Sequence, residues 1–380
     1  MVVYLFVIFC CLVCVYSFDV KKRKIGCDIT FWGICFLLIV VAGMRYQIGA
    51  DTINYMDEFR YVKKLSDLSA QDFSDTRFMP GWIIFASMCK SLCPQFIGLQ
   101  FIHATILNIS IFLFIRQFSQ YRFTAVLMYV LLAYLNLNTE ILRESLAMSI
   151  FFLAIVAFVR NKWIVYFILC FIVSMIHVSG VITFIFPVGK LLSSHSRKKI
   201  ITSFICIIAL SGVLWNFFQT YIIDFFIIGA IEVGAEAYIN NDYVQNINGI
   251  IVSLTTRCVI PFLTIFFALK LKHKSSNLIH LGYIYIIIGV FTLFNSVIFL
   301  RFQTYATIPF IIILSDTLFT LTRKRNVVVA SIILFGLIIP QYYTYCKPET
   351  NIYNDNLKTY VYQRYVPYQM WPERNNTSAY

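Results

Sequence analysis

Five ionisable residues stand beside long apolar runs, where charge is rare: Arg45, Asp51, Arg143, His177 and Arg301. An ionisable group at membrane depth costs roughly 2.5 kcal/mol or more to insert, so such residues are candidates for function. Arginine suits a phosphate because its planar guanidinium donates two parallel hydrogen bonds. We therefore predict that Arg45, Arg143 and Arg301 bind an anion, of which a lipid pyrophosphate at the membrane surface is the obvious example.

Two of these residues, His177 and Asp51, are the candidates for a catalytic base. The unperturbed pKa of histidine, near ~6.5, suits proton transfer at neutral pH. Asp51 would need a raised pKa, or would act only by orienting a substrate. The cysteines and histidines show no zinc spacing, and the chain has no glycine-rich phosphate loop. The sequence therefore predicts neither a bound metal nor a cofactor.

Each candidate also has a structural explanation, and the sequence leaves both interpretations open. An arginine can extend its charge to lipid head groups, a buried histidine can be neutral and hydrogen-bonded, and an aspartate can cap a helix. The structural alternatives are a head-group contact for Arg45, an ion pair with Glu140 or Glu144 for Arg143, a helix junction for His177, an interface anchor for Arg301 and a cap before Thr52 for Asp51. The functional interpretation is favoured because the predicted spans bring all five to one side of the membrane.

Membrane helices are the elements that must position these residues. Of the 380 residues, 59% are hydrophobic and only 13% are charged, about half the charged share of a soluble domain. A chain in lipid satisfies its backbone only as helices or a closed barrel, and the apolar runs here are continuous rather than alternating. We therefore predict an all-α polytopic transmembrane bundle of roughly 10–13 membrane segments, forming a single integral-membrane domain over residues 1–380.

The net charge of +13 follows membrane topology better than nucleic-acid binding. The basic residues cluster in short loops between apolar runs, as the positive-inside bias requires. Residues 21–24 are all basic and follow the apolar run 1–18, whereas a cleaved signal peptide carries its positive charge before the apolar region. We therefore expect a first span with its N-terminus outside. Most of the eleven cysteines lie inside apolar runs, where cysteine packs as a small hydrophobic residue.

Counting spans from residues 21–24 predicts two large outer loops, at about 45–77 and 219–248, and an outer C-terminal tail at about 347–380. The three apolar runs between residues 29 and 115 must make an even number of crossings if Arg116 and residues 21–24 share a side. The run 78–93 is the shortest and falls below the ~20 residues that a span needs. We predict that it is re-entrant or interfacial; the alternative is that Arg116 lies on the other side.

Five short segments together resemble the EpsG family of bacterial polysaccharide-assembly membrane proteins, which is related to the Wzy-type polymerases of O-antigen and capsule. They are MRYQIGADTINY at 44–55, ILRESLAMSI at 141–150, FIVSMIHVSG at 171–180, LRFQTY at 300–305 and YVPY at 365–368. Their order and spacing run through the whole chain. Glu144 is a departure, because glutamine is expected there after the arginine, and it puts a precise role for the pair 143–144 in doubt.

The resemblance implies a membrane glycosyltransferase that joins oligosaccharide repeat units carried on undecaprenyl pyrophosphate. It would act in O-antigen, capsule or exopolysaccharide biosynthesis, at the outer leaflet of the bacterial cytoplasmic (inner) membrane. The expected partners are the lipid-linked repeat units, the growing polymer and membrane lipids, with a chain-length regulator and a flippase of the same pathway as further candidates. The resemblance implies neither a nucleotide sugar nor a metal.

Two other functions would also place cations toward a membrane cavity. A flippase or transporter for lipid-linked oligosaccharides is one, although such proteins commonly contain two related halves and this sequence shows no internal symmetry. An O-antigen ligase-like transferase is the other, and it differs in phenotype because polymer would be made but not attached. A membrane acyltransferase would also carry an intramembrane histidine, but the resemblance at both ends of the chain disfavours it.

Overall fold

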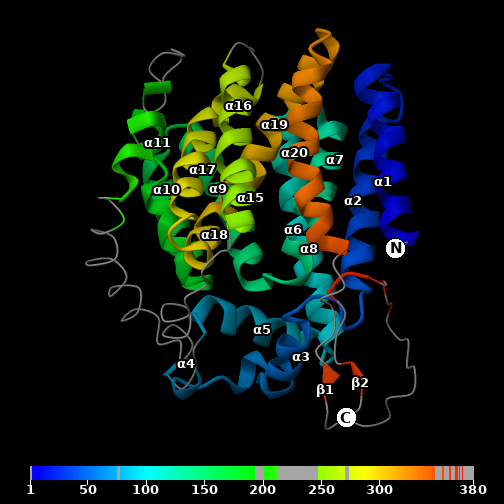
Figure 1. Ribbon diagram of the computed structural model, residues 1–380. Coiled ribbons are helices and arrows are strands. Elements are labelled where there is room, and N and C mark those ends of the chain that lie inside the picture. Colours follow the sequence, from blue (N-terminus) through cyan, green and yellow to red (C-terminus); the bar gives the residue numbers. More distant parts are fainter. Residues whose placement is uncertain are drawn as a thin grey trace.

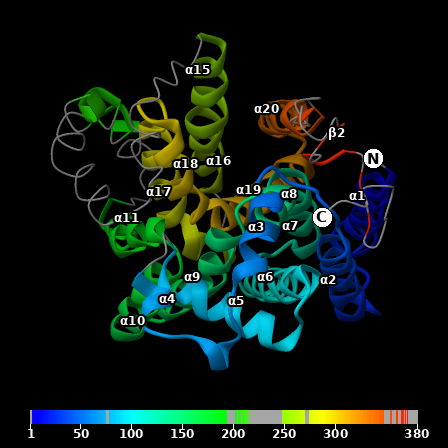
Figure 2. The same cartoon turned by 90° about the horizontal axis from the view of Figure 1, so that it is seen from below.

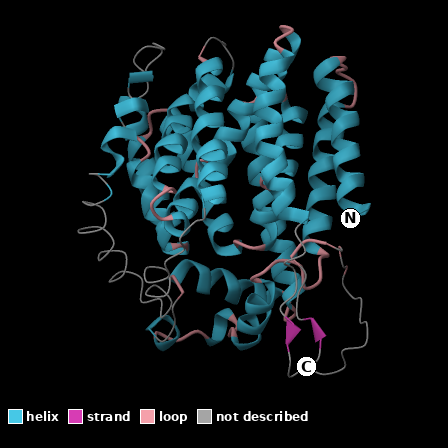
Figure 3. Cartoon of the chain, in the orientation of Figure 1, coloured by secondary structure: helices cyan, strands magenta, loops and turns pink. Residues whose placement is uncertain are grey.

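The protein is a bundle of α-helices in a computed structural model, which confirms the predicted all-α class (Figures 1 and 3). The structure describes residues 2–74, 78–192, 201–202, 204–206, 208–212, 215, 247–269, 274–346, 353–354, 359–360, 364–366, 368 and 370. The predicted outer loop 219–248 therefore lies outside the described residues except for its last two positions, and so does most of the predicted tail.

Five helical stretches in the described part of the chain are long and apolar enough to cross a membrane: Val2–Val20, Phe96–Phe118, Leu142–Val159, Gly249–Ala268 and Ile298–Arg323. Shorter apolar helices stand beside them at Cys27–Gly43, Arg122–Leu132, Trp163–Ile176, Val178–Lys190 and Val327–Tyr343. A helix satisfies its interior backbone groups within itself, which is what hydrocarbon demands of a spanning segment.

The first half of the chain supplies one side of the bundle and a layer at its end. Its elements are α1 (Val2–Cys14), η1 (Val15–Val20), α2 (Cys27–Gly43), α3 (Thr52–Tyr61), η2 (Leu65–Asp67), α4 (Gln71–Ser74), α5 (Pro80–Leu92), α6 (Phe96–Phe118), α7 (Arg122–Leu132), α8 (Tyr134–Thr139), α9 (Leu142–Val159), α10 (Trp163–Ile176), η3 (Val178–Ile185) and α11 (Val188–Leu192).

The second half packs against α7, α9 and α11. Its elements are α15 (Ile247–Leu254), η4 (Thr255–Val259), α16 (Ile260–Ala268), η5 (Lys274–Leu278), α17 (Ile279–Phe291), α18 (Ser296–Thr304), α19 (Thr307–Arg323), α20 (Val327–Cys346) and the antiparallel pair β1 (Tyr353–Asn354) and β2 (Thr359–Tyr360). The segment η4 is a π-helical turn inside a spanning helix, a feature that is frequent at functional sites.

Basic loops gather at one end of the bundle, which we call the basic end. Arg122 donates to Asp28 at 3.1 Å, so the loop between α6 and α7 lies beside the start of α2. Lys22, Tyr121 and Arg323 line one common depression there. Arg116 therefore lies on the same side as residues 21–24, and the alternative sidedness for Arg116 is wrong.

The opposite end, which we call the site end, carries a layer formed by α3, α4 and α5 (Figure 1). Seen from below, α5 lies across the ends of the bundle helices, and it packs on α6 and α10 (Figure 2). The segment 78–93 is therefore interfacial rather than spanning, which leaves an even number of crossings between the two basic loops. Pro80 lies in the first turn of α5, where a backbone N–H would have no partner within the helix, so the missing N–H of proline costs nothing there.

A buried polar network holds α8 at the site end. Asn108 Nδ2 donates to Asn138 Oδ1 at 2.8 Å, and the Tyr129 hydroxyl donates to Asn108 Oδ1 at 2.9 Å. All three side chains are fully buried, so each hydrogen bond avoids the cost of an unsatisfied polar group in lipid. The network fixes the short helix α8 and thereby the break from which α9 begins.

Candidate functional site

Three of the five predicted residues come together at the site end, each from a different element. Arg143 stands in the first turn of α9, His177 lies between α10 and η3, and Arg301 belongs to α18. Both arginines lie within electrostatic range of the His177 imidazole. Helices far apart in the sequence thus bring two cations and a histidine to one place.

The break after α10 gives His177 its position. The helix ends because His177 adopts an extended backbone conformation, and Ser179 N–H donates to its Nδ1 at 3.3 Å. The Ser179 hydroxyl lies 2.6 Å from Nδ1 and 3.3 Å from the Tyr305 hydroxyl. Since a backbone N–H can only donate, Nδ1 is an acceptor and the neutral ring carries its proton on Nε2. His177 is 5% exposed and has the helix-junction environment that the structural alternative describes.

Arg143 joins the bundle to the overlying layer. Its guanidinium carbon lies 4.7 Å from the centre of the Phe78 ring, and its side chain hydrogen-bonds the Tyr55 hydroxyl. Glu144 beside it is 2% exposed and lies within range of Arg301 and of the Thr304 hydroxyl. Glu144 thus adds a buried carboxyl group beside the two guanidinium groups.

Asp51 lies at the edge of the same group. It precedes α3 as its N-cap residue, but its side chain makes no capping hydrogen bond, so the capping alternative is not realised. Partial desolvation raises the pKa of the Asp51 carboxyl, and Glu140 adds to the rise, whereas Arg143, Arg301 and Arg364 oppose it. Asp51 is exposed at the surface, which leaves it open to an incoming substrate.

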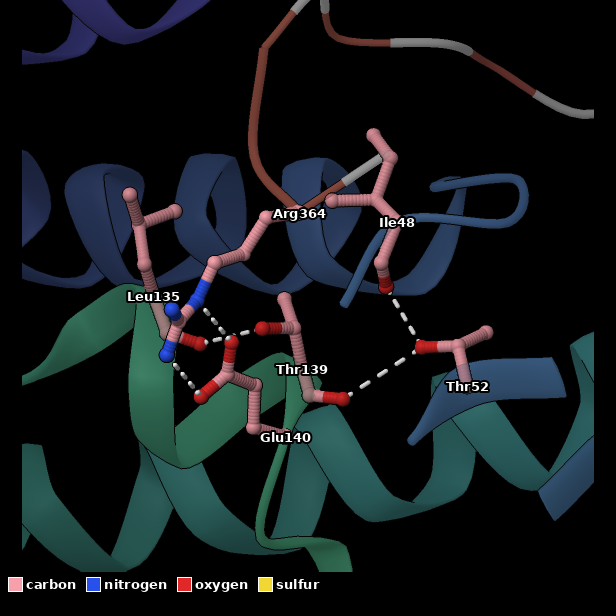
Figure 4. Close-up of polar contacts among 6 residues, drawn as sticks. All are labelled: Ile48, Thr52, Leu135, Thr139, Glu140 and Arg364. Atoms are coloured by element: carbon pink, nitrogen blue, oxygen red, sulfur yellow. Dashed lines mark hydrogen bonds and ion pairs between the residues drawn. The ribbon is translucent and has the colours of Figure 1, made fainter. Parts of the chain in front are cut away.

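The C-terminal tail returns to this place through an ion pair. Arg364 donates from Nε to Glu140 Oε1 at 2.8 Å and from Nη2 to Oε2 at 3.4 Å, so the pair is forked (Figure 4). Beside it, Thr52 links the loop before α3 to the end of α8, because its hydroxyl reaches both Ile48 O and Thr139 O. Glu140, named above as a candidate partner of Arg143, is thus engaged by Arg364.

Arg45 lies apart from the other four residues. Its guanidinium is 1% exposed, and Nη1 donates to Ala42 O at 2.6 Å at the C-terminal end of α2. Tyr4, Tyr134 and Tyr368 surround it, and burial lowers its pKa to about 10, so it stays charged at neutral pH. Within the described residues, Arg45 makes no contact with the other four. A cation at this end of a helix stabilises the helix dipole.

A cavity of about 530 Å³ opens beside the site, between α8, α15, α17, α18, α19 and α20. Glu140, Thr304 and Arg364 connect its wall to the site residues. Arg257 also lines it from the π-helical turn η4 and donates to Gln303 Oε1 at 2.8 Å. Arg257 is not among the residues predicted from the sequence, although a lone arginine inside the apolar run 249–271 is a signal for function.

Fold and site together define a polytopic helical membrane protein whose arginines, carboxylates and histidine gather at one end of its bundle. The family model described as "EpsG family" matches residues 28–370, and the chain belongs to this family of Wzy-type polysaccharide polymerase-like proteins. The predicted resemblance is thereby confirmed. No curated protein and no solved structure matches the chain.

Proposed function

We propose that the protein is a Wzy-type polymerase that joins oligosaccharide repeat units carried on undecaprenyl pyrophosphate. It would act at the outer leaflet of the bacterial cytoplasmic membrane, in O-antigen, capsule or exopolysaccharide biosynthesis. Membership of the EpsG family supports a polysaccharide polymerase-like membrane protein. The observation that carries the proposal is the meeting of Arg143, Arg301 and His177 at the end of the bundle away from the basic loops.

The reaction is a glycosyl transfer between two lipid-linked sugars. A hydroxyl oxygen of the acceptor unit attacks the anomeric carbon of the growing chain, and the bond from that carbon to the pyrophosphate oxygen breaks. Negative charge then grows on the leaving lipid pyrophosphate. Arg143 and Arg301 stabilise that charge more in the transition state than in the ground state, which is the condition for catalysis.

Asp51 accepts the proton of the attacking hydroxyl in this proposal. Its exposure lets it meet a substrate, and its raised pKa makes the carboxylate a stronger base than an ordinary aspartate. The hydrogen bond from Ser179 N–H occupies Nδ1 of His177, so the imidazole presents Nε2–H, a donor. We therefore assign His177 to a hydrogen bond with the leaving group and prefer Asp51 as the base.

The cavity beside the site supports a lipid-linked donor. Its volume of about 530 Å³ lies within the roughly 300–1,000 Å³ typical of small-molecule sites, and its lining mixes apolar side chains with Glu140, Arg257 and Arg364. The apolar walls suit the first part of a lipid chain, and Arg257 offers a further cation to the pyrophosphate. Arg257 thus joins Arg143 and Arg301 as a proposed anion-binding residue, while Arg45 is assigned to the end of α2.

The test is glycan length on the surface of the native host after deletion of the gene and complementation. We expect Arg143→Ala, Arg301→Ala and Asp51→Asn to leave single repeat units on the outer face at wild-type membrane levels. Arg116→Ala, at the basic end, is the matched control and should restore long polymer. Long polymer from all three site variants would contradict the proposal.

The same experiment separates the two other functions. Repeat units stranded inside the cell in the deletion strain would favour a flippase. Full-length polymer that is made but not attached to its final carrier would favour a ligase.

A further inference from the structure

A second pocket lies at the site end, between α3 and α5, and none of the residues assigned above to the reaction lines it. We propose that it binds a sugar ring at the non-reducing end of the acceptor repeat unit. This inference rests on the proposed polymerase function, because it supplies the second substrate of that reaction. The probe for it is a lipid-free oligosaccharide, so binding can be measured without turnover.

Aromatic rings form a large part of the pocket wall, because six of its fifteen lining residues are aromatic. The pocket has a volume of about 300 Å³, and Tyr55, Phe59, Phe78 and Trp82 are among its lining residues. The Tyr55 and Trp82 rings lie 5.9 Å apart, and both side chains are more than nine-tenths buried. A sugar ring has an apolar face of C–H groups that packs on aromatic rings, so this lining fits a pyranose better than it fits an ion.

Charged side chains also line the pocket. Glu58 contributes a carboxylate to the wall, and Lys63 and Asp72 form an ion pair of 2.7 Å at the rim. The Lys63 ammonium, with hydrogen bonds from Ser69, lowers the pKa of Asp72 to about 2, so the pair stays charged at neutral pH. Carboxylates accept hydrogen bonds from hydroxyls, and these are stronger than hydrogen bonds between neutral groups.

One buried hydroxyl in the wall has no partner among the described residues. Ser87 is 0% exposed and lines the pocket, and its Oγ makes no hydrogen bond there. A buried polar atom without a partner calls for an explanation, because leaving it unpaired costs free energy. This hydroxyl lies beneath the surface that solvent reaches, so it belongs to the packing under the pocket wall and not to the sugar-binding groups.

The pocket shares two residues with the arginine site. Phe78 lines the pocket and carries Arg143 over its ring at 4.7 Å, and Tyr55 lines the pocket and hydrogen-bonds Arg143. A sugar bound there would thus lie next to the residue that we assign to the leaving pyrophosphate.

The location favours the acceptor over the donor. The layer of α3, α4 and α5 lies beyond the ends of the bundle helices (Figures 1 and 2). The pocket is lined from this layer and by the first turn of α6, whereas the 530 Å³ cavity is lined by helices of the bundle. The non-reducing end of a repeat unit is the part farthest from its lipid. A sugar beyond the bundle therefore fits the acceptor, and a pyrophosphate between the helices fits the donor.

The test measures binding of lipid-free repeat-unit oligosaccharide, released by mild acid from the host's own glycan, to the full-length protein in nanodiscs. Saturation-transfer NMR should detect the sugar on the wild type. We expect Glu58→Gln to weaken binding roughly tenfold, which is the loss of one charge-assisted hydrogen bond. Asp57→Asn is the matched control, because Asp57 is a neighbour on α3 that pairs with Arg60 outside the pocket.

A second pair of variants tests the aromatic wall with a smaller disturbance. Trp82→Phe should weaken binding and shorten the surface glycan, whereas Trp163→Phe, on α10 outside the pocket, should change neither. Wild-type binding and glycan length in both Glu58→Gln and Trp82→Phe would overturn the inference. Arg301 is not among the residues that line the pocket, so Arg301→Ala should abolish polymer yet retain oligosaccharide binding. Failure of the pocket and failure of the polymerase assignment therefore give different results.

Discussion

At the scale of single residues, the same side chain has different roles in different surroundings. Arg143 lies on Phe78 beside Tyr55 and within electrostatic range of His177, whereas Arg45 is enclosed by tyrosines and donates to a carbonyl of α2. Both have the sequence signature of an arginine next to an apolar run. The two arginines differ in the groups that surround each guanidinium.

Arg45→Ala is therefore expected to affect stability first. It removes a hydrogen bond to Ala42 O and a cation at a helix C-terminus, a change worth roughly 1–2 kcal/mol. Thermal unfolding in detergent should show a lower midpoint, with Arg45→Lys between the variant and the wild type. A variant of normal stability that makes no polymer would instead return Arg45 to the phosphate-binding group.

The pH dependence of polymerisation tests Asp51 as the base. A base acts in its ionised form, so activity should be lost as the pH falls through the Asp51 pKa. Because partial desolvation and Glu140 raise that pKa, the loss should occur at a higher pH than for an ordinary aspartate. Glu140→Gln should move the acid limb to lower pH, since it removes a neighbouring negative charge and releases Arg364.

Polymerisation in proteoliposomes at a series of pH values measures this shift. Asp57→Asn, on the same helix as the capping position of Asp51, is the control and should leave the acid limb in place. An acid limb that persists in Asp51→Asn would assign the base to another residue.

At the scale of elements, breaks in helices place the site residues. The break between α8 and α9 sets Arg143, the break between α10 and η3 sets His177, and the loop between α2 and α3 sets Asp51. Each break is held by polar contacts to a neighbouring segment, as the Thr52–Thr139 contact shows in Figure 4. A continuous helix would hold none of these side chains at the end of the bundle.

Gly49→Ala tests the most constrained of these breaks. Gly49 has φ +105°, a conformation that L residues rarely adopt, and a Cβ there would lie 2.7 Å from Thr139 O. The combined strain and clash should cost roughly 1–3 kcal/mol. The thermal unfolding midpoint should fall and polymer should shorten.

Gly33→Ala in α2 is the control for Gly49→Ala, because its Cβ would meet nothing within 4 Å. Equal midpoints for the two variants would show that the loop adapts at no cost.

At the scale of the whole molecule, the segments that resemble the family converge. The segments 44–55, 141–150, 171–180 and 300–305 and the tail at 365–368 all supply residues to the site end. The matched region ends at residue 370, where Met370 forms a bridge with Arg45. The residues of the site thus come from nearly the full length of the chain.

Cysteine accessibility tests the sidedness that this arrangement requires. Single cysteines introduced at positions 22 and 122 of a cysteine-free variant should react with membrane-impermeant reagent only from the basic side. Cysteines at positions 51 and 364 should react only from the other side, because α5 lies across the bundle instead of crossing the membrane. Labelling of 51 and 122 from one side would contradict the topology and the mechanism built on it.

The sequence by itself determined the fold class, the basic end and three of the residues that meet at the site. These follow from local physics, because hydrocarbon demands long apolar helices and because a charge beside such a helix needs a reason to be there. The separation of Arg45 from the site, the choice between Asp51 and His177, the cavity with Arg257 and the Arg364–Glu140 pair were decided only by tertiary structure. They depend on which helix ends lie side by side and on which nitrogen of an imidazole a neighbour occupies, and contacts between distant segments determine both.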